Sequence, residues 1–200
     1  GSLGADTTAT ATAAGTIVNL QNGSTLTLKG DKTVAIKGDK TITINDGTTL
    51  QTNKDVIISN AVFLNGGKDT INTHGNNSTV TGVISGVGQF VKTGDGSLTL
   101  NAQTATVKTD VSGNPTDEIV YKDTNNTYTG GTLLDGGLLI VKDGNQLGAA
   151  GTDVTINSGT LQIANDITLS RNIIVNTVSG GSISTAGHDV VLDGAVGGLG

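Results

Sequence analysis

Residues 125–148 read NNTYTGGTLLDGGLLIVKDGNQLG, and this stretch decides the fold. Two short runs of aliphatic and β-branched residues, 128–134 and 138–141, lie between glycine pairs and Asp-Gly steps. Such runs are typical of β-strands, whereas glycine and aspartate are typical of tight turns. The stretch therefore predicts a bend, a strand, a second bend and a second strand.

A related pattern stands upstream in residues 82–101, GVISGVGQFVKTGDGSLTLN, where glycines bracket the runs 89–93 and 97–100. Together the two stretches contain G-x-G-x-F-x-K-x-G-x-G-S-L-T-L, then N-x-Y-T-G-G-T and L-x-I. This pair resembles the autotransporter-associated β-strand repeat of bacterial type V secretion passengers. The residues that carry the resemblance are Gly86, Gly88, Phe90, Lys92, Gly94, Gly96, Ser97, Leu98, Thr99, Leu100, Asn126, Tyr128, Thr129, Gly130, Gly131, Thr132, Leu138 and Ile140.

The resemblance covers residues 82–148, while residues 151–200 continue in the same style and residues 1–80 agree in composition and period. Residues 102–125 depart from it, because the family has only a few residues at this point. The resemblance implies a passenger that is secreted or displayed on the bacterial surface. Any membrane contact would be made through a C-terminal barrel outside this sequence.

Three versions of one phrase begin eight residues apart, at residues 25–30, 33–38 and 41–46. Each alternates apolar and polar side chains as a half-buried strand does. The three phrases occupy 24 residues, enough for one coil of three short strands. Antiparallel hairpins are the alternative, but repetition at coil-like periods and rows of Thr, Asn and Ser favour stacked coils. We predict an all-β, right-handed parallel β-helix with about three short strands per coil.

The prediction divides the chain into a flexible lead-in or cap at residues 1–15 and a β-helix at residues 16–200. Gly1-Ser2 is typical of a cloning scar, and we expect the sequence to be a piece of a longer protein. Residues 102–125, which hold Pro115, are expected to form a loop or hairpin. Further strands are expected at residues 55–60, 61–65, 69–73, 79–85, 89–93, 97–101, 153–156, 160–163, 167–169, 172–175, 182–184 and 189–192.

The amino-acid composition limits the kinds of core, metal site and partner that the chain can have. Hydrophobic residues make up 34% of the 200 residues, with two Phe, two Tyr and no Trp, so Val, Ile and Leu must form the core. The absence of cysteine excludes disulfides and thiolate metal sites. Residues 1–92 carry +1 and residues 93–200 carry −7, which sum to −6. Because the chain is acidic and has one arginine, nucleic acid is a poor partner.

Catalytic and metal-binding patterns are weak. The two histidines, His74 and His188, lie in polar glycine-flanked bends. His188 and Asp189 can form a dyad, but no Gly-x-Ser-x-Gly elbow accompanies them. Residues 65–71, NGGKDTI, have some likeness to one turn of a calcium-binding roll, which would need tandem copies. We therefore expect no enzyme, no cofactor and no metal site.

Two places are candidate binding sites. Lys-Gly-Asp occurs twice and resembles an integrin-recognition tripeptide, and the insertion carries an acidic pair beside an apolar run. The candidate residues are Lys29, Asp31, Lys37, Asp39, Asp117, Glu118 and Tyr121.

The expected function is adhesion to host cells through a host cell-surface protein or glycan, by a protein that is secreted or held at the outer membrane. One alternative is a released virulence factor that acts on a specific host receptor. Another is the scaffold of a polysaccharide-acting or proteolytic passenger. Self-association is also possible, because exposed strand edges favour stacking.

Overall fold

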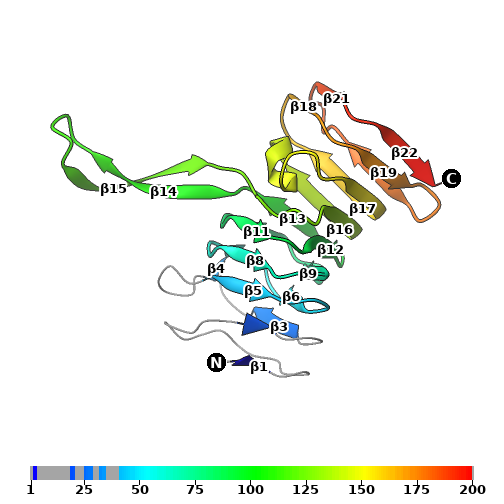
Figure 1. The fold of residues 1–200 in the computed structure, drawn as a ribbon, viewed down its shortest axis with the longest axis horizontal. Helices are drawn as coiled ribbons and strands as arrows, with labels where there is room; N and C mark the ends of the chain where they lie inside the picture. Colours follow the sequence, from blue (N-terminus) through cyan, green and yellow to red (C-terminus); the bar gives the residue numbers. More distant parts are fainter. Residues whose placement is uncertain (1, 4–18, 21–24, 29–31, 35–40, 200) are drawn as a thin grey trace.

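The computed structural model describes residues 2–3, 19–20, 25–28, 32–34 and 41–199. The described chain forms a parallel β-solenoid of about seven turns. Figure 1 shows the coils stacked into a rod, with the N-terminal coils at one end and the C-terminal coils at the other. The predicted parallel β-helix is confirmed, because every strand pair except β14–β15 is parallel.

The strands of the coils lie in three columns that run along the rod. The first column contains β1 (Ser2–Leu3), β2 (Asn19–Leu20), β5 (Ile42–Ile44), β8 (Val62–Leu64) and β11 (Ile84–Gly86). The second contains β3 (Thr25–Leu28), β6 (Thr49–Thr52), β9 (Lys68–Asn72), β12 (Gln89–Thr93), the first halves of β16 (Thr132–Val141) and β17 (Val154–Ile163), β19 (Ile173–Asn176) and β22 (Val196–Leu199). The third contains β4 (Lys32–Val34), β7 (Val56–Ile58), β10 (Ser78–Val80), β13 (Ser97–Leu100), the second halves of β16 and β17, and β20 (Gly181–Ser184).

The remaining elements complete the C-terminal coils. β18 (Ile167–Leu169) pairs with β21 (Val190–Leu192), and each precedes a second-column strand as β5 and β8 do. A short 3-10 helix, η1 (Gly144–Leu147), follows β16. β14 (Gln103–Thr109) and β15 (Pro115–Asp123) form a separate hairpin between β13 and β16.

The three N-terminal phrases occupy the three columns as predicted. β3, β4 and β5 each lie in a different column, and Thr25 pairs with Thr49 at a separation of 24 residues. Later coils are shorter, because Ile140 pairs with Gln162, a separation of 22 residues. The coils up to β11 therefore close after three short strands, whereas β16 and β17 each run through two columns as one long strand.

The core is a narrow pillar of aliphatic side chains. Strands alternate buried and exposed positions, as period-2 geometry requires. Leu98, Leu139 and Leu161 lie opposite one another in successive coils, and all three are fully buried. Because each inward side chain packs on its equivalents in the coils before and after it, burial accumulates in rows.

Polar side chains form matching rows on the outside of the solenoid. Asn157 donates a hydrogen bond to Asp135 of the preceding coil at 2.8 Å, and Asn176 donates one to Asn157 at 2.9 Å. Thr160 and Ser182 are 2.8 Å apart in another such row. These contacts are the predicted stacking of polar residues between coils.

Two predicted strands were wrong at their corners. The run 128–134 becomes a strand only at Thr132, because Gly131 has φ of 79° and Gly130 packs against the backbone of Gly88. The run 79–85 contains a corner at Gly82, where a Cβ atom would lie 1.8 Å from the carbonyl oxygen of Asn60. Both corners need glycine because neighbouring coils approach closely.

The leucine row allows a direct test of the pillar. We expect Leu139→Ala to lower the free energy of unfolding by about 2–5 kcal/mol, because it leaves a cavity between two stacked leucines. Leu138→Ala, at the adjacent half-buried position, should cost about 1 kcal/mol or less. Urea unfolding followed by circular dichroism measures both. Equal costs would contradict the assignment of Leu139 to the core.

Candidate contact surface on the β14–β15 hairpin

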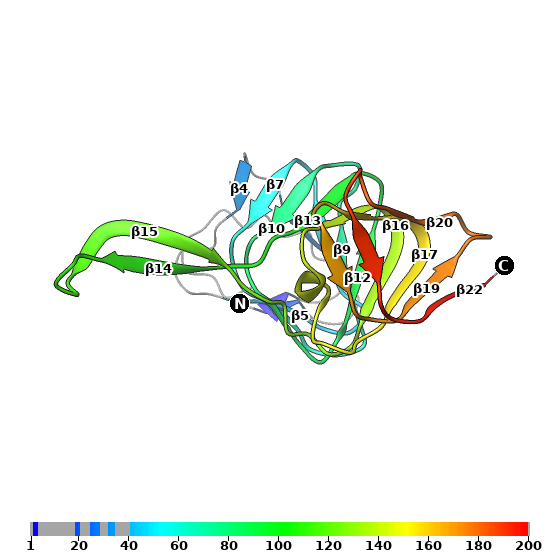
Figure 2. The ribbon, with the colours of Figure 1, turned by 90° about the horizontal axis from the view of Figure 1, so that it is seen from above.

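The hairpin projects from the middle of the solenoid. Figures 1 and 2 show it clear of the described coils from two directions. Its antiparallel register pairs Ala105 with Tyr121 and Val107 with Ile119. Both strands are exposed along almost their whole length, in contrast to solenoid strands such as β6 and β16, which have buried side chains facing the core. The hairpin is therefore a two-sided arm on a rigid support.

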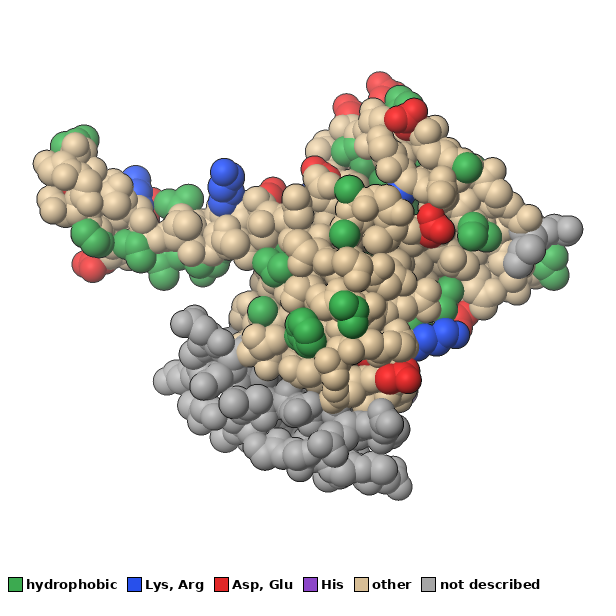
Figure 3. Space-filling view, in the orientation of Figure 1, with side chains coloured by type: hydrophobic (Ala, Val, Ile, Leu, Met, Phe, Trp, Pro, Cys, Tyr) green, Lys and Arg blue, Asp and Glu red, His purple; other side chains and the backbone are tan. Residues whose placement is uncertain are grey.

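One face of the hairpin is apolar. Paired residues of an antiparallel ribbon lie on the same face, so Ala105, Val107, Ile119 and Tyr121 are neighbours. Val107 and Ile119 are each 55% exposed and Tyr121 is 64% exposed. Figure 3 shows apolar side chains along the lower long side of the hairpin and lysines along the upper side. Such an apolar face is typical of an interaction surface.

The opposite face is more polar, with one ion pair and with Val120 as an exposed apolar residue. Lys108 Nζ lies 2.8 Å from Glu118 Oε2, with both side chains more than half exposed. Thr104 and Thr106 direct their hydroxyl groups towards the carbonyl oxygens of Lys122 and Val120. An exposed ion pair stabilises little, about 0–1 kcal/mol. This face therefore keeps the arm soluble and adds little stability.

The tip of the hairpin is an ordered turn. The Asp110 carboxylate accepts hydrogen bonds from the backbone N–H groups of Ser112 (2.8 Å) and Asn114 (2.9 Å). These bonds, those from Asn114 first, lower the pKa of Asp110. Gly113 has φ of 83°, which its lack of a side chain permits. The turn fixes the register of the two strands.

Two buried amide side chains fasten the base of the hairpin to the solenoid. Thr124 N–H donates to the Ala102 carbonyl at 2.9 Å. The Gln146 side chain accepts from Ala102 N–H at 2.9 Å and donates to the Thr124 carbonyl at 2.9 Å. Asn126 accepts from Ile84 N–H and donates to the Gln146 carbonyl, both at 2.8 Å. These bonds join the base to coils on both sides of the insertion.

The candidate residues predicted in the insertion lie on β15, the second strand of this hairpin. Asp117, Glu118 and Tyr121 are exposed residues of β15. Val107 was missed, because only the register of the pair brings it beside Ile119. The alternation of Thr with Ala105 and Val107 before the Ser-Gly-Asn-Pro turn could have indicated it. The Lys-Gly-Asp candidates, Lys29, Asp31, Lys37 and Asp39, lie outside the described residues.

Lys92, the charged residue of the repeat pattern described above, has a structural role inside the solenoid. It is fully buried, and its Nζ donates to the carbonyl oxygens of Thr93 (3.0 Å), Gly94 (2.6 Å) and Gly136 (3.1 Å). Burial lowers the pKa of Lys92 to about 8, and Asp95 opposes this shift. Lys92 therefore ties two coils together and is not available to a ligand.

The aromatic residue of the pattern is also structural. Tyr128 is fully buried, its hydroxyl lies 2.7 Å from Thr132 Oγ1, and its ring centroid is 5.6 Å from that of Phe90. Burial raises the pKa of Tyr128, while Thr132 and then Arg171 oppose the shift. The two aromatic rings fill the core at the level of the insertion.

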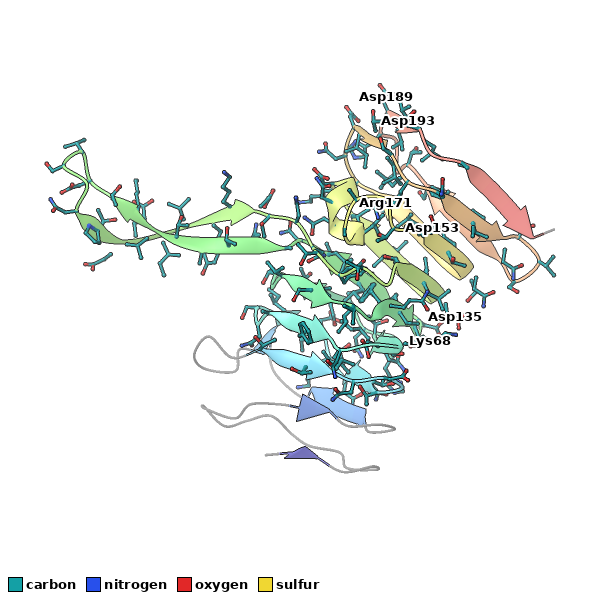
Figure 4. All side chains as sticks on the ribbon, viewed as in Figure 1. Lys68, Asp135, Asp153, Arg171, Asp189 and Asp193 are labelled. Carbon is teal, nitrogen blue, oxygen red and sulfur yellow. The ribbon has the colours of Figure 1, made fainter. Side chains whose placement is uncertain are left out.

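Arg171 was not singled out from the sequence, yet it closes the C-terminal coils. Figure 4 shows it inside the solenoid beside η1. Its guanidinium donates to the carbonyl oxygens of Gly144 (2.7 Å), Leu147 (2.8 Å) and Thr152 (3.2 Å). Burial lowers its pKa, although it remains charged. The single arginine therefore satisfies backbone groups and leaves no free guanidinium for a ligand.

The catalytic and metal-binding alternatives gain no support from the geometry. The suggested dyad of His188 with Asp189 is wrong, because His188 Nδ1 contacts Asp166 Oδ1 at 3.0 Å in an exposed corner. His74 is exposed in a turn, and its backbone N–H donates to Asn72. Within the described ranges, no three His, Asp or Glu residues are grouped to hold a metal ion.

Asp69, in the glycine-rich bend that has some likeness to a calcium roll, points into the core. It is fully buried, its Oδ2 accepts from Gly66 N–H at 3.3 Å, and its Oδ1 is unpaired. Burial raises the pKa of Asp69 to about 6, Gly66 opposes the shift and Asp46 adds to it. An unpaired buried carboxylate destabilises the fold.

The Asp69 carboxyl gives a pH-dependent prediction. Between pH 3.8 and about 6 the folded state keeps a proton that the unfolded state has lost, so stability falls as pH rises. Asp69, Phe90 and Thr132 lie opposite one another in successive coils. Asp69→Thr therefore introduces a residue type that already occurs at this position of a coil. We expect the variant to be more stable than the wild type above pH 6, with the difference shrinking towards pH 4.

Thermal unfolding between pH 4 and 8 measures this difference. Asp117→Thr on the exposed hairpin is the control and should leave the pH profile unchanged. Parallel profiles for wild type and Asp69→Thr would contradict the burial of the charge.

The base of the hairpin gives a second prediction. Gln146→Ala leaves Ala102 N–H and the Thr124 carbonyl without their buried partner, which costs roughly 1–3 kcal/mol. Hydrogen exchange at the Ala102 amide should accelerate while exchange in β9 stays slow. Gln162→Ala, at an outward position of β17, is the control. Unchanged exchange at Ala102 would show that the Gln146 bridge does not hold the hairpin.

Comparisons with known proteins identify a related protein. The chain is similar to the adhesin BmaC autotransporter of Brucella suis biovar 1 (strain 1330), at 27% identity over 131 residues. The match covers 62% of this chain and 4% of the relative. No protein-family profile matches the chain, and no solved structure matches it. In the described part of the chain, no helix has the length and apolar character needed to cross a membrane. The parallel β-solenoid and the match to an autotransporter adhesin together fit an autotransporter passenger domain, a class that is secreted or held at the bacterial outer membrane.

Proposed function

We propose that this chain is a segment of an adhesion-type passenger, in which the solenoid is the scaffold and the β14–β15 hairpin contacts the host surface. The observation that carries the proposal is the exposed apolar face of Ala105, Val107, Ile119 and Tyr121. It extends from a rod that carries rows of hydrogen-bonded polar side chains, with exposed apolar residues such as Phe63 and Val87 among them. The adhesin relative supports the same class of function.

The hairpin is suited to this role by its position. Its base is held by buried hydrogen bonds, so its strands keep a defined direction away from the rod. Rigid presentation lowers the entropy cost of binding, because fewer groups are ordered on contact. A partner can therefore reach both faces without contacting the coils.

A non-catalytic role fits the same observations. Polar groups that could serve chemistry, such as Lys92 and Arg171, are engaged with backbone carbonyls in the core. The described surface offers no histidine beside an activated nucleophile, since His188 pairs with Asp166. We therefore propose binding without catalysis. Binding through the two Lys-Gly-Asp tripeptides, which begin at Lys29 and Lys37, is a separate proposal that rests on the sequence.

The proposal is tested by removing the hairpin. Because Ala102 and Thr124 are already hydrogen-bonded, residues 103–123 can be replaced by Asn-Gly, which suits a two-residue hairpin turn. We expect the deleted protein to lose most of its binding to cultured animal cells, measured with fluorescently labelled protein. Its circular dichroism spectrum should retain the strand signal of the solenoid.

A triple substitution separates the apolar face from the presence of the hairpin. Val107→Ser, Ile119→Ser and Tyr121→Ser together should reduce cell binding as the deletion does. The matched control changes three exposed valines elsewhere, Val87 (67% exposed), Val178 (80%) and Val191 (58%), to Ser. Undiminished binding by the deletion, or equal losses in both triple variants, would refute the proposal.

A further inference from the structure

We propose that the outer edge of β15 binds an extended polypeptide strand of the partner, with apolar residues at its centre and basic residues on both sides. This inference rests on the proposed function of the hairpin and narrows the partner to a protein segment. It would add a third strand to the β14–β15 ribbon, as in other cases of strand addition.

The first step is the direction of the backbone groups of β15. Thr124 N–H donates to the Ala102 carbonyl, so Ala102 and Thr124 form a hydrogen-bonded pair. Such pairs alternate along an antiparallel ladder. Lys122 and Val120 therefore direct their backbone groups towards β14, where the hydroxyls of Thr104 and Thr106 also approach their carbonyl oxygens.

It follows that Ile119 and Tyr121 direct their backbone N–H and C=O groups to the outer edge. Among the described strands, only β14 pairs with β15, so this edge carries no strand of the described chain. The side chains of Ile119 and Tyr121 also belong to the apolar face. A strand added here would gain backbone hydrogen bonds and apolar contacts from the same two residues.

The edge lacks the usual protection against pairing. Edge strands commonly carry lysine, proline or a bulge where another strand could add. In β15, Pro115 and the register shift at residues 116–118 lie on the tip side of Ile119, and Lys122 lies on the base side of Tyr121. The central run Ile-Val-Tyr at residues 119–121 has none of these. Another strand can therefore add to β15 at residues 119–121, where the apolar side chains of Ile119 and Tyr121 lie.

The acidic residues of β15 indicate which side chains the partner strand carries at its two ends. In the sequence, Asp117 and Asp123 are each three residues from Val120, the middle residue of the apolar run. Glu118 is engaged with Lys108, whereas Asp123 accepts a hydrogen bond from neutral Gln103. In all, β15 carries three acidic side chains and one basic side chain. A strand with basic residues at its ends is complementary to this arrangement.

The same charges oppose a second copy of this chain as the occupant. The antiparallel register that sets Ile119 opposite Tyr121 of another β15 also sets Asp117 opposite Asp123, because both pairs of numbers sum to 240. This juxtaposition would occur twice. Like charges directly opposite each other destabilise a strand pair, so self-pairing along β15 is disfavoured.

A synthetic peptide, Lys-Thr-Val-Thr-Ile-Thr-Lys, tests the inference directly. Paired antiparallel with its central Thr opposite Val120, it sets Val opposite Tyr121 and Ile opposite Ile119. Its terminal lysines then lie opposite Asp123 and Asp117. Fluorescence anisotropy with the full chain should give saturable binding that weakens with added salt.

Two peptide controls separate the contributions. Glu-Thr-Val-Thr-Ile-Thr-Glu should bind about tenfold more weakly, because each flanking pair becomes repulsive. The lysine peptide N-methylated at Val and Ile should lose binding about tenfold or more, because these amides would donate to β15. Equal binding of the N-methylated peptide would overturn strand addition, and equal binding of the glutamate peptide would overturn the basic flanks.

Protein variants test the edge itself. Tyr121→Pro removes an outward N–H from β15, whereas Ala105→Pro removes the equivalent N–H from the β14 edge opposite it. We expect loss of peptide binding in the first and wild-type binding in the second. Tyr121→Thr, which keeps the N–H and a strand-forming side chain, should retain part of the binding. Loss in Ala105→Pro alone would overturn the choice of edge.

The outcomes distinguish this inference from the proposed function. If hairpin deletion abolishes cell binding while Tyr121→Pro binds cells normally and the peptide does not bind, the inference fails and the contact role stands. If the deletion leaves cell binding unchanged, the contact role fails. A dimer in sedimentation that Tyr121→Pro abolishes would identify a second copy as the occupant and overturn the basic partner.

Discussion

The parallel hydrogen-bond ladder between successive coils requires their backbones to run about 4.8 Å apart. At the corners, where strands turn, that spacing leaves no room for a side chain between neighbouring coils. A Cβ atom on Gly82 would lie 1.8 Å from the Asn60 carbonyl, and one on Gly130 would lie 2.3 Å from Gly88. The glycines at these corners are therefore a consequence of the ladder, and the aliphatic rows inside depend on the same register.

The ladder also explains how an insertion of this size is tolerated. β12 pairs with the first half of β16 and β13 with its second half, so the coils before and after the hairpin stack directly on each other. Gln146 and Asn126 replace the backbone bonds that the departing chain would otherwise leave unpaired. The solenoid can therefore present an arm without interrupting its core, which is what a scaffold for surface contacts needs.

Two charged residues, Lys92 and Arg171, hold successive coils together from inside the solenoid. Lys92 and Arg171 donate to backbone carbonyls at corners, where regular strand pairing ends. Buried charges are stable in such sites only when hydrogen-bonded. Hydrogen-bond satisfaction is incomplete at two buried atoms of the described residues, because Asp69 Oδ1 and Arg171 Nε have no hydrogen-bond partner. The exposed side chains of the hairpin are therefore the ones to which we assign the proposed contact role.

The sequence by itself determined the coil, because alternation of apolar residues and turn residues are local properties. It predicted three strands per coil and the position of the insertion. Only the tertiary structure decided which residues meet between coils or across the hairpin. The partner of His188 is Asp166, which is 22 residues away, and Val107 lies beside Ile119 through the register of the ribbon. Such contacts depend on the number of residues in each coil and turn, which local patterns do not fix, so the apolar face and the buried roles of Lys92 and Arg171 emerged only in three dimensions.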